Sequence, residues 1–515
     1  MFVSRLQDMF ISLLKPWIPF VAKIPVKLRY RLITACFMAD IVLFGIVRYV
    51  LLRESYFYNT TLGIFLMIAI AILSLDVKLE KVRWRRSIWL SWFGMCIAFT
   101  VSDILVPKKV CGLGVVLALV FTGVFFVWQN NSRRDLLWEC FKKSIRISFW
   151  IISIFSFCFR PIYQGGRYAG IFTNPNTFGL YLFVIFAVFM SDLDWDTATG
   201  KRLLGSLPTY ISIALVWFYL EISQARTALL ACGTILFMWL VLRLVRAIKK
   251  HRWSSFLKHT LIMIAFVVAL YPVYRVTVAY LPWIVDHPLI FKGESLYLSD
   301  GSKIYDMGET VIAEPDVDAE SMIEGYKIEN LEEVVDNTGK LVVPATKTES
   351  DEPEKPIVPK NVMDRLWFVL ENTKGLNALT SGRIEIYKGY YKQLNYKGHP
   401  NVSLTINGGK KAHAHNNWLQ FGYTYGYFGL IFYTIITVLG VAMSIKFYLR
   451  RDRKNISYAF LIPAICVGFV VATMAECLFL PFEVFPAFAF WFVFGEIFVK
   501  KVPEKNINYN GGKYE

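Results

Sequence analysis

Apolar stretches long enough to cross a lipid bilayer recur along most of this 515-residue chain. A helix needs about 20 mainly apolar residues to cross the ~30 Å hydrocarbon core of a membrane. The composition, 55% hydrophobic and 16% aromatic, suits lipid as the solvent. Twelve windows meet this requirement: 32–52, 60–77, 87–107, 110–129, 144–162, 177–192, 207–222, 227–246, 259–280, 418–446, 457–475 and 478–499. The sequence therefore predicts an all-α polytopic membrane protein with about twelve transmembrane helices, nine of them in 32–280 and three in 418–499.

Lysine and arginine residues cluster in alternate loops between these windows. Loops that stay in the cytoplasm carry an excess of both residues near the helix ends. The clusters lie at 78–86, 133–143, 246–252, 450–454 and 500–501. We therefore predict that both termini are cytoplasmic, with residues 1–31 as a basic segment on the membrane surface and residues 500–515 as a tail. This orientation and contact with lipid headgroups explain the net charge of +17, so no nucleic acid partner is expected.

Residues 281–417 form the longest interruption and are predicted to lie on the extracytoplasmic side. Between Asp286 and Lys360 there are 18 acidic and 7 basic residues. Short alternating runs predict a small strand-rich insert at about 294–360, which ends in a proline-rich linker. We interpret this insert as a solvated spacer. None of the eight cysteines falls in this region, which excludes a disulfide framework and a thiolate metal site there.

The part of this loop from about 361 to 397 differs in character from the acidic insert. Four apolar or aromatic residues recur there at helical spacing: Ile384, Tyr387, Tyr391 and Leu394. The spacing predicts an amphipathic helix that lies on the membrane-embedded body and opens at Arg383.

Four arginines lie on the extracytoplasmic side, where few cations are expected. They are Arg160, Arg167, Arg226 and Arg383. A single external arginine is most often a headgroup anchor. Several arginines beside other polar motifs favour an anion site, because guanidinium groups bind phosphate oxygens in bidentate fashion.

The stretch RYAGIFTNPNTFGLYL offers a second means of binding an anion. Asn-Pro is a turn signal, and Asn174 or Asn176 can cap the helix that follows. The unpaired N–H groups of that helix would face outward beside Arg167, and helix N-termini attract phosphate. Two glycines before Arg167 permit close approach of the backbone. A turn and cap without a ligand is the competing interpretation.

Two histidines, His413 and His415, precede the predicted helix at 418–446. If this helix begins near Asn416, His415 stands at the positive end of its dipole, with external arginines nearby. Both effects disfavour the imidazolium, so the neutral ring is available to accept a proton as a general base. We favour His415 and keep His413 as the second candidate. The alternatives are a metal-binding pair, for which no carboxylate cluster is evident, and an interfacial histidine without a role.

Four motifs follow one another along the chain: RYAGIFTNPNTFGLYL, SQARTALLA, SGRIEIYKGYYKQL and HAHNNWLQFGYTYGYFGL. Their order and shared sidedness resemble the O-antigen ligase and O-antigen polymerase superfamily of bacterial envelope glycosyltransferases. Together with the twelve-helix layout, the resemblance covers most of the chain from about 150 to 440. One departure is Ala225-Arg226-Thr227, where the family has a Ser-Arg-Gly-like element. The acidic stretch at 294–360 is a second departure from the family pattern. The motifs do not distinguish the ligase branch from the polymerase branch.

The resemblance implies a GT-C-like, metal-independent and inverting glycosyltransferase of the bacterial cytoplasmic membrane, without a cofactor. Its donor would be an oligosaccharide on an isoprenoid diphosphate, and its acceptor a glycan or glycolipid hydroxyl on the outer face. Membrane lipids and other envelope-biosynthesis proteins are further expected partners. By similarity, Arg167, Arg226 and Arg383, with Arg160 beside them, would bind the diphosphate, and His415 would activate the acceptor hydroxyl. The physical chemistry agrees, because the reaction needs a base and a stabilised anionic leaving group.

The main alternative to a glycosyltransferase is a transporter or flippase for the same kind of lipid-linked sugar. A third possible function is that of a receptor or scaffold that uses the acidic loop. Transporters place polar groups and broken helices near mid-membrane, whereas these motifs gather at the outer helix ends. The exceptions are Asp40, Glu221, Glu476 and Glu483. Glu476 and Glu483 are candidates to orient an arginine or to line a sugar groove. The sequence has no Walker loop, kinase signature or nucleophile elbow, which argues against ATP-driven work.

Overall fold

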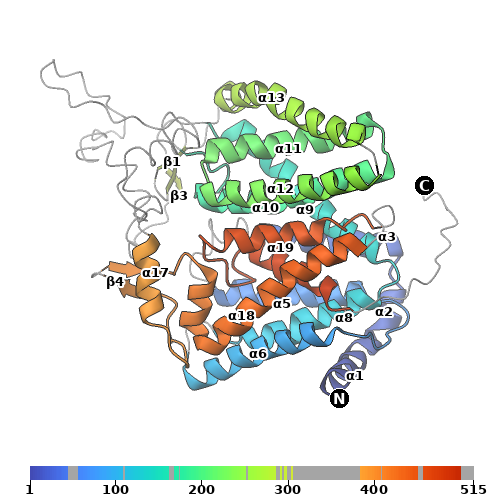
Figure 1. Ribbon diagram of the computed structural model, residues 1–515, viewed down its shortest axis with the longest axis vertical. Coiled ribbons are helices and arrows are strands. Elements are labelled where there is room, and N and C mark those ends of the chain that lie inside the picture. The colour runs from blue at the N-terminus through green and yellow to red at the C-terminus, as the bar shows by residue number, and fades with distance from the viewer. Residues whose placement is uncertain are drawn as a thin grey trace, which may run out of the picture.

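Long helices lie side by side in this protein, and short strands and one short helix gather at one end of them (Figure 1). The computed structural model describes residues 1–515 except 44–55, 108–110, 162–166, 173, 251–252, 286–289, 293–294, 298–302, 306–382, 407–408, 451–455 and 500–515. The linker, the tail and nearly all of the acidic insert, together with the glycines before Arg167, therefore lie outside the described residues.

The helices and strands follow the chain in this order. They are α1 (Phe2–Leu14), η1 (Lys15–Trp17), α2 (Ile18–Ala22), α3 (Val26–Val42), α5 (Tyr56–Leu73), α6 (Arg86–Leu105), α7 (Leu113–Val116), η3 (Leu117–Phe121), α8 (Thr122–Asn130), α9 (Arg134–Phe159), α10 (Pro175–Thr199), α11 (Leu203–Ser223), α12 (Arg226–Lys250), α13 (Trp253–Ile284), β1 (Ile290–Lys292), β2 (Ser295–Tyr297), β3 (Lys303–Tyr305), α17 (Arg383–Lys392), β4 (Leu404–Ile406), β5 (Gly409–Lys411), α18 (Asn417–Arg450), α19 (Leu461–Ala472), α20 (Phe485–Phe494) and η5 (Gly495–Ile497).

Seven helices of the described part are long and apolar enough to cross a membrane. They are Arg86–Leu105, Leu113–Asn130, Pro175–Thr199, Leu203–Ser223, Arg226–Ile248, Phe256–Ile284 and Asn417–Arg450. Shorter apolar helices occur at Thr60–Leu73, Leu461–Ala472 and Phe485–Ile497. The protein is therefore mainly helical and membrane-embedded, as the apolar windows predict.

The predicted window at 144–162 falls in α9, which is not one of these seven helices. Its apolar part follows directly on Lys142, Lys143 and Arg146, and cations are costly in hydrocarbon unless they are paired. The count of twelve spans stays a prediction.

Helix α10 is the most enclosed of the seven helices. Of the residues in its most apolar stretch 89% are buried, against 17% in α13. Its start is defined locally, because the Asn174 side chain accepts a hydrogen bond from the Asn176 N–H and Pro175 occupies the first turn. A Cβ on Gly179 would lie 2.4 Å from that of Ala225, so only glycine lets α10 approach the start of α12 this closely.

Contacts between the far ends of three helices define one end of the bundle. The Tyr448 hydroxyl of α18 accepts a hydrogen bond from Arg246 of α12 at 2.7 Å and lies 3.1 Å from the Asp194 carboxylate of α10. We call this the basic end, because α9 also begins here at Arg134 and α12 ends here at Lys250. The first residues of α10, α12 and α18 consequently lie together at the opposite end, which we call the site end.

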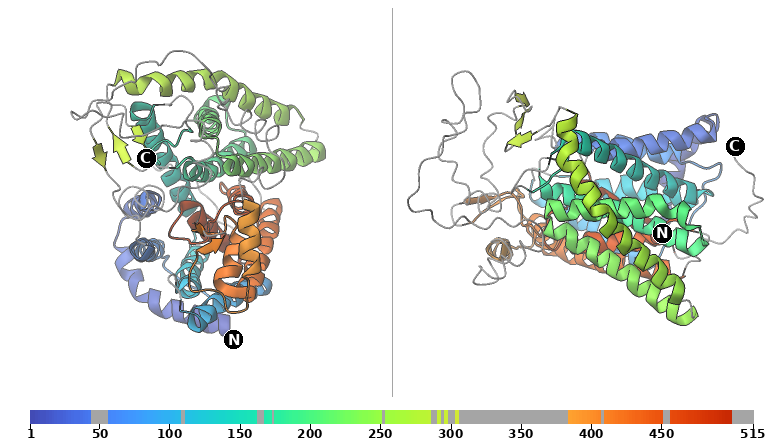
Figure 2. Two further views of the ribbon diagram at one scale, coloured as in Figure 1. Left: turned by 90° about the vertical axis from the view of Figure 1, so that its left-hand side faces the viewer. Right: turned by 90° about the horizontal axis from the view of Figure 1, so that it is seen from above.

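The chain segments before α6 and after α20 also meet at the basic end. The Arg85 N–H donates to the Phe498 carbonyl at 2.6 Å, and the Gln7 side chain of α1 donates to the Val82 carbonyl at 3.0 Å. In two perpendicular views the strands β1 and β3 lie at the other end of the bundle from these contacts (Figures 1 and 2). The N-terminal helix and the last described residues therefore share one end.

Two small antiparallel sheets modify the all-α prediction. One has the strand order β1-β2-β3, and the other is the hairpin β4-β5, in which Ile406 pairs with Gly409. The first sheet begins slightly before the predicted strand-rich insert. The hairpin was not predicted, although Asn407-Gly408 is a strong two-residue turn signal between two short strands. Helix α17 covers Arg383–Lys392 of the predicted helical part 361–397, and the residues before Arg383 lie outside the described residues, so its predicted start at Arg383 stays a prediction.

Helix α18 is interrupted at Gly426, whose φ of 76° and ψ of −178° are not helical. Residues 395–399 pack across this break. The Tyr427 N–H donates to the Asn395 carbonyl at 2.9 Å, and a Cβ on Gly426 would lie 2.4 Å from the Tyr396 carbonyl oxygen. Glycine is required here by both the positive φ and the close approach, and the backbone groups freed by the break find partners within the protein.

Candidate functional site

His415 lies two residues before α18 and has a left-handed backbone, with φ of 47°. Positive φ is uncommon outside glycine and costs roughly 1–3 kcal/mol, so the surrounding structure must hold it. Asn416 caps the helix by accepting from the Leu419 N–H at 3.0 Å, and its amide donates to the Met474 carbonyl at 3.0 Å. The turn that carries His415 is therefore fastened to the segment after α19.

Glu476 lies between an arginine and a histidine. Its Oε1 accepts from Arg383 Nη2 at 2.9 Å, and its Oε2 lies 3.6 Å from His415 Nδ1. The second distance is slightly longer than a hydrogen bond, and in the described part of the chain the buried Nδ1 has no hydrogen-bond partner. Because Nδ1 faces the carboxylate, Nε2 is the ring nitrogen that remains to accept a proton. We call Arg383, Tyr387, His415 and Glu476 the histidine cluster.

The electrostatic surroundings of His415 differ from those expected from the sequence. Only cationic neighbours were anticipated, yet the nearest charged group is a carboxylate. Burial raises the pKa of Glu476, but the facing His415, the charge of Arg383 and the nearby His413 together lower this pKa to about 2. Glu476 is therefore an anion at neutral pH, and it orients the imidazole and the guanidinium at the same time.

His413 and His415 lie on the same side of the turn, with ring centroids 4.2 Å apart. The His415 N–H lies 3.3 Å from His413 Nδ1. Tyr387, one turn after Arg383 in α17, donates to the carbonyls of His415 and Met474, at 3.2 Å in each case. Tyr387 was expected only as part of an amphipathic face, and its spacing of four from Arg383 is the signal that could have identified it.

A second group of polar residues surrounds Arg167 at the site end. Its Nη2 donates to Asn176 Oδ1 at 2.6 Å, and its Nε donates to the Ser223 carbonyl at 3.0 Å. Nη2 also lies 3.4 Å from the Gln224 carbonyl. These contacts join the start of α10 to the end of α11, so the Asn174 cap and Arg167 lie side by side. We call Arg167, Asn174, Asn176, Gln224 and Arg226 the arginine cluster.

Arg226 is the first residue of α12, two positions after Gln224. Gln224 has φ of 50°, and Gln224 and His415 are the non-glycine residues with positive φ in the described part of the chain. Each of these strained residues lies two positions before a helix whose start carries a predicted site motif. Such strain concentrates at functional sites and supports a hypothesis of function at these two turns.

Arg160 follows the last residue of α9 and is buried. Its Nε donates to the Gly170 carbonyl, so it holds the turn between Arg167 and the Asn174 cap. This contact gives Arg160 a structural task at the edge of the arginine cluster, whereas the predicted diphosphate contact stays a prediction.

Helix α19 lies between the two clusters. A Cβ on its Gly468 would lie 2.8 Å from Ile235 of α12 and 3.1 Å from Phe183 of α10. Arg226 lies nine positions before Ile235, which is about 13 Å along the helix. Glu476, a member of the histidine cluster, follows Gly468 by eight positions along the chain. Both clusters therefore lie at the site end on neighbouring elements, and their convergence on one substrate stays a prediction.

The other acidic candidates occupy different surroundings. Glu221, near the end of α11, accepts from the Tyr271 hydroxyl at 2.9 Å. Glu483 lies two residues before α20 and is half-buried. Asp40 is fully buried on α3, and neither of its carboxylate oxygens has a hydrogen-bond partner among the described residues. Among the described residues, no group of three or more His, Cys, Asp or Glu side chains is arranged to hold a metal ion.

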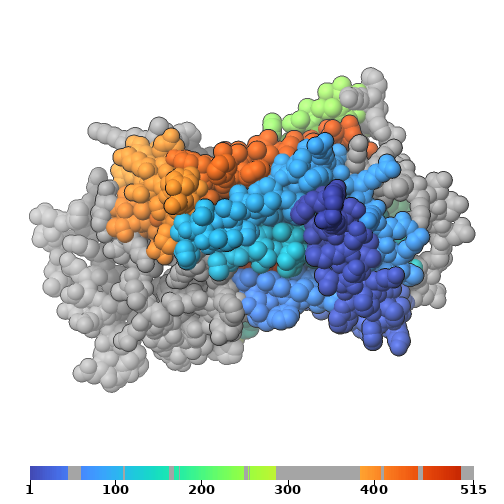
Figure 3. All heavy atoms as spheres, turned by 90° about the horizontal axis from the view of Figure 1, so that it is seen from below, coloured from blue at the N-terminus to red at the C-terminus, as the bar shows by residue number. Residues whose placement is uncertain are grey.

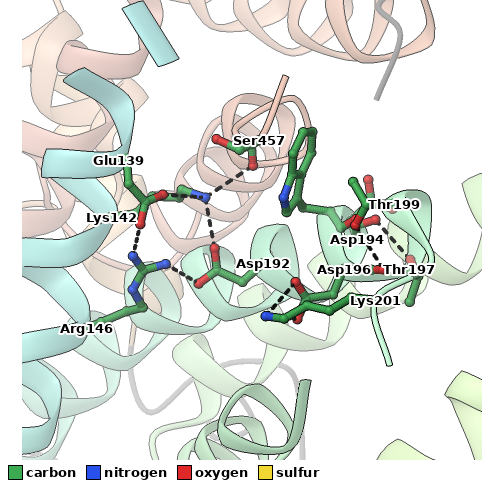
Figure 4. A network of polar contacts seen from close by, with 11 residues as sticks. Glu139, Lys142, Arg146, Asp192, Asp194, Asp196, Thr197, Thr199, Lys201 and Ser457 are labelled. Carbon is green, nitrogen blue, oxygen red and sulfur yellow. Dashed lines mark hydrogen bonds and ion pairs between the residues drawn. The ribbon is translucent and has the colours of Figure 1, made fainter. Parts of the chain in front are cut away.

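Buried charges also meet at the basic end (Figure 4). Asp192 of α10 accepts from Lys142 Nζ at 2.9 Å and from Arg146 Nη1 at 2.8 Å, both on α9. Glu139 contacts the same two cations, and Lys142 also donates to the Ser457 carbonyl at 3.2 Å. We call these five residues the basic-end network. Two cations are matched by two anions, so the network is neutral and joins three parts of the chain.

Comparisons with known proteins give no match for this chain, whether with family models, curated proteins or solved structures.

Proposed function

We propose that this protein is a membrane glycosyltransferase of the O-antigen ligase or polymerase type. It transfers or polymerises a glycan from an isoprenoid diphosphate-linked donor onto an acceptor hydroxyl at the site end. The observation that carries the proposal is the line Arg383–Glu476–His415 on a strained turn at the start of α18. The arginine cluster on neighbouring helices supports it with further cations and a capped helix start.

In the proposed reaction, the acceptor hydroxyl oxygen attacks the anomeric carbon of the donor sugar. The bond from that carbon to the diphosphate oxygen breaks, and the electron pair leaves with the lipid diphosphate. His415 Nε2 takes the hydroxyl proton, and the facing Glu476 carboxylate compensates the charge that the ring gains. Guanidinium groups stabilise the charge of the leaving diphosphate, and the single displacement inverts the configuration at the anomeric carbon.

We also propose that the site end faces away from the cytoplasm. The support is the distribution of basic loops, since α9 begins and α12 and α18 end at the basic end. With the predicted twelve spans, both termini are cytoplasmic, in the bacterial cytoplasmic membrane. Reporter fusions at each terminus test this arrangement, and an extracytoplasmic signal from either fusion would contradict it.

The decisive experiment is reconstitution of the purified protein with a lipid-linked oligosaccharide, with and without a candidate acceptor. A ladder of lengthened glycans indicates a polymerase, and one product that depends on the acceptor indicates a ligase. His415→Ala should remove either product while the protein stays folded. The absence of any new glycosidic linkage with the wild-type protein would refute the proposal.

A transporter or flippase of lipid-linked oligosaccharide is the alternative, and the break at Gly426 favours it, since transporters use broken helices. The break, however, lies nine positions after the start of α18 and is bonded to residues 395–399 at the site end, away from mid-membrane. In the same reconstitution, a fluorescent lipid-linked sugar that crosses the bilayer without forming a new linkage would establish the transporter.

A further inference from the structure

Exposed aromatic residues gather where α17 meets the start of α18. The Tyr391 side chain is 70% exposed, and Tyr396, Tyr427 and Phe428 are exposed as well. The Tyr427 hydroxyl donates to the Leu394 carbonyl at 3.1 Å, and the Tyr396 carbonyl lies against Gly426. These contacts join the segment after α17 to the break in α18, so the aromatic rings belong to one continuous surface.

Exposed cations lie along the same surface. Lys388 and Lys392 of α17 and Lys397 are all exposed, and Lys397 Nζ lies 5.4 Å from the centroid of the Tyr396 ring. Within α17 the sequence offers one acidic residue, Glu385. The surface is therefore aromatic and positively charged, and it complements a negatively charged partner.

An exposed apolar stripe on α18 continues from this surface toward the basic end. It comprises Phe428, Ile431, Ile435 and Val438, which recur at helical spacing on one face. The stripe from Phe428 to Val438 is about 15 Å long, half of the ~30 Å hydrocarbon thickness. Figure 3 shows the residues of α17 to β5 in orange beside the start of α18 and next to α6. The aromatic and cationic surface thus lies where the lipid-facing part of α18 ends.

We propose that Tyr391, Tyr396, Tyr427, Lys388, Lys392 and Lys397 form a headgroup belt that seats α17 on the bilayer by binding anionic phospholipids. Tyrosine is enriched at membrane interfaces, where its ring lies in the apolar boundary and its hydroxyl in the headgroup layer. Lysine stems cover apolar surface while the ammonium group reaches the phosphates. Because Arg383 lies on the same helix, the belt also positions Arg383 against Glu476.

The proposal requires membrane embedding and does not depend on the glycosyltransferase assignment. It can be tested with the full-length protein in nanodiscs of phosphatidylcholine and phosphatidylglycerol that contain no isoprenoid lipid. Benzoylphenylalanine replaces Tyr391 or Tyr396 in separate variants, and mass spectrometry identifies the adducts after illumination. Excluding isoprenoid lipid separates headgroup binding from binding of a donor.

The matched control is benzoylphenylalanine at Thr405, an exposed position on β4. The hairpin packs on the opposite face of α17, because Ile406 contacts Gly389, which points about 200° away from Tyr391 around the helix. We expect lipid adducts at 391 and 396 to exceed those at 405 several-fold. We also expect phosphatidylglycerol to be enriched over its share of the bilayer, and Lys392→Gln with Lys397→Gln to remove that enrichment.

Three outcomes would overturn the proposal. The first is equal adduct yields at 391, 396 and 405, and the second is an adduct with a second copy of the chain. The third is a lipid adduct without preference for phosphatidylglycerol, which would remove the anionic headgroup as the partner. Size-exclusion chromatography of each variant confirms that it is folded before illumination.

Discussion

The histidine cluster and the basic-end network both use charged side chains next to the membrane, but they use them differently. In the basic-end network, Lys142 and Asp192 are buried and each has a partner of opposite charge. In the histidine cluster, one carboxylate serves an arginine and a histidine, and the histidine has a strained backbone. A satisfied and neutral network is suited to holding helices together, whereas a cluster with a strained backbone is suited to chemistry.

The largest expected effect on glycan transfer follows from removing the His415 side chain. His415→Ala should lower glycan transfer by roughly 10² to 10⁴-fold, because the proposed general base is lost. The free energy of unfolding should change by less than about 1 kcal/mol, since removing the side chain leaves the Asn416 cap in place. Transfer is measured with lipid-linked donor, and stability by thermal unfolding in detergent. His413→Ala tests the second candidate for the base, and near-normal transfer by His415→Ala would remove His415 as the base.

Breaking the basic-end network should produce the opposite pattern. Asp192→Ala leaves Lys142 and Arg146 buried with too little negative charge, which should destabilise the protein by about 3–5 kcal/mol. Transfer per folded molecule should stay unchanged. Thermal unfolding together with transfer normalised to folded protein separates the two effects. Glu139→Gln, at a partly exposed position, should cost less than about 1 kcal/mol. A loss of specific activity in well-folded Asp192→Ala would contradict a purely structural role for the basic-end network.

The substitution Arg167→Lys tests whether the arginine cluster binds the diphosphate. Lysine retains the charge but loses the planar fork that reaches Asn176 and the Ser223 carbonyl. We expect transfer to fall about 10²-fold, comparable to the loss of one donor that stabilises developing charge. Arg202→Lys, at an exposed position before α11, is the matched control and should be silent. Equal transfer by both variants would count against diphosphate binding at Arg167.

The smallest effect is expected for Glu476→Gln, and it depends on pH. Because the pKa of Glu476 is lowered to about 2, the ionised carboxylate stabilises the folded state fully above its ordinary pKa of about 4.3. This contribution is lost as the pH falls from about 4.3 toward 2. The wild-type protein should exceed the variant in unfolding free energy by about 1–3 kcal/mol between pH 5 and 8. Thermal unfolding across pH measures the gap, and a gap that widens below pH 4 would contradict the assignment.

Several elements could be predicted from local sequence alone. The Asn-Pro-Asn signal locates the start of α10, and α18 begins at Asn417, one position before the predicted window. Each of these features depends on capping and hydrophobic spacing, which act within a few residues. The Asn407-Gly408 hairpin signal is equally local and was overlooked.

The partners of the charged residues could not be predicted in this way. Glu476 was one of four acidic exceptions, and the sequence does not say that it lies between Arg383 and His415, 93 and 61 positions away along the chain. Lys142 looked like a cytoplasmic loop cation, yet it is buried against Asp192. Both pairings depend on how distant helices pack, and no local pattern encodes that packing.

The sequence by itself determined that this chain is a helical membrane protein and where its polar helix starts lie, because apolar length and capping are properties of neighbouring residues. Only the tertiary structure decided which charges meet. It placed a carboxylate beside His415 and a neutral ion network at the far end of α10, because the low dielectric of the interior makes each buried charge depend on a partner from another helix.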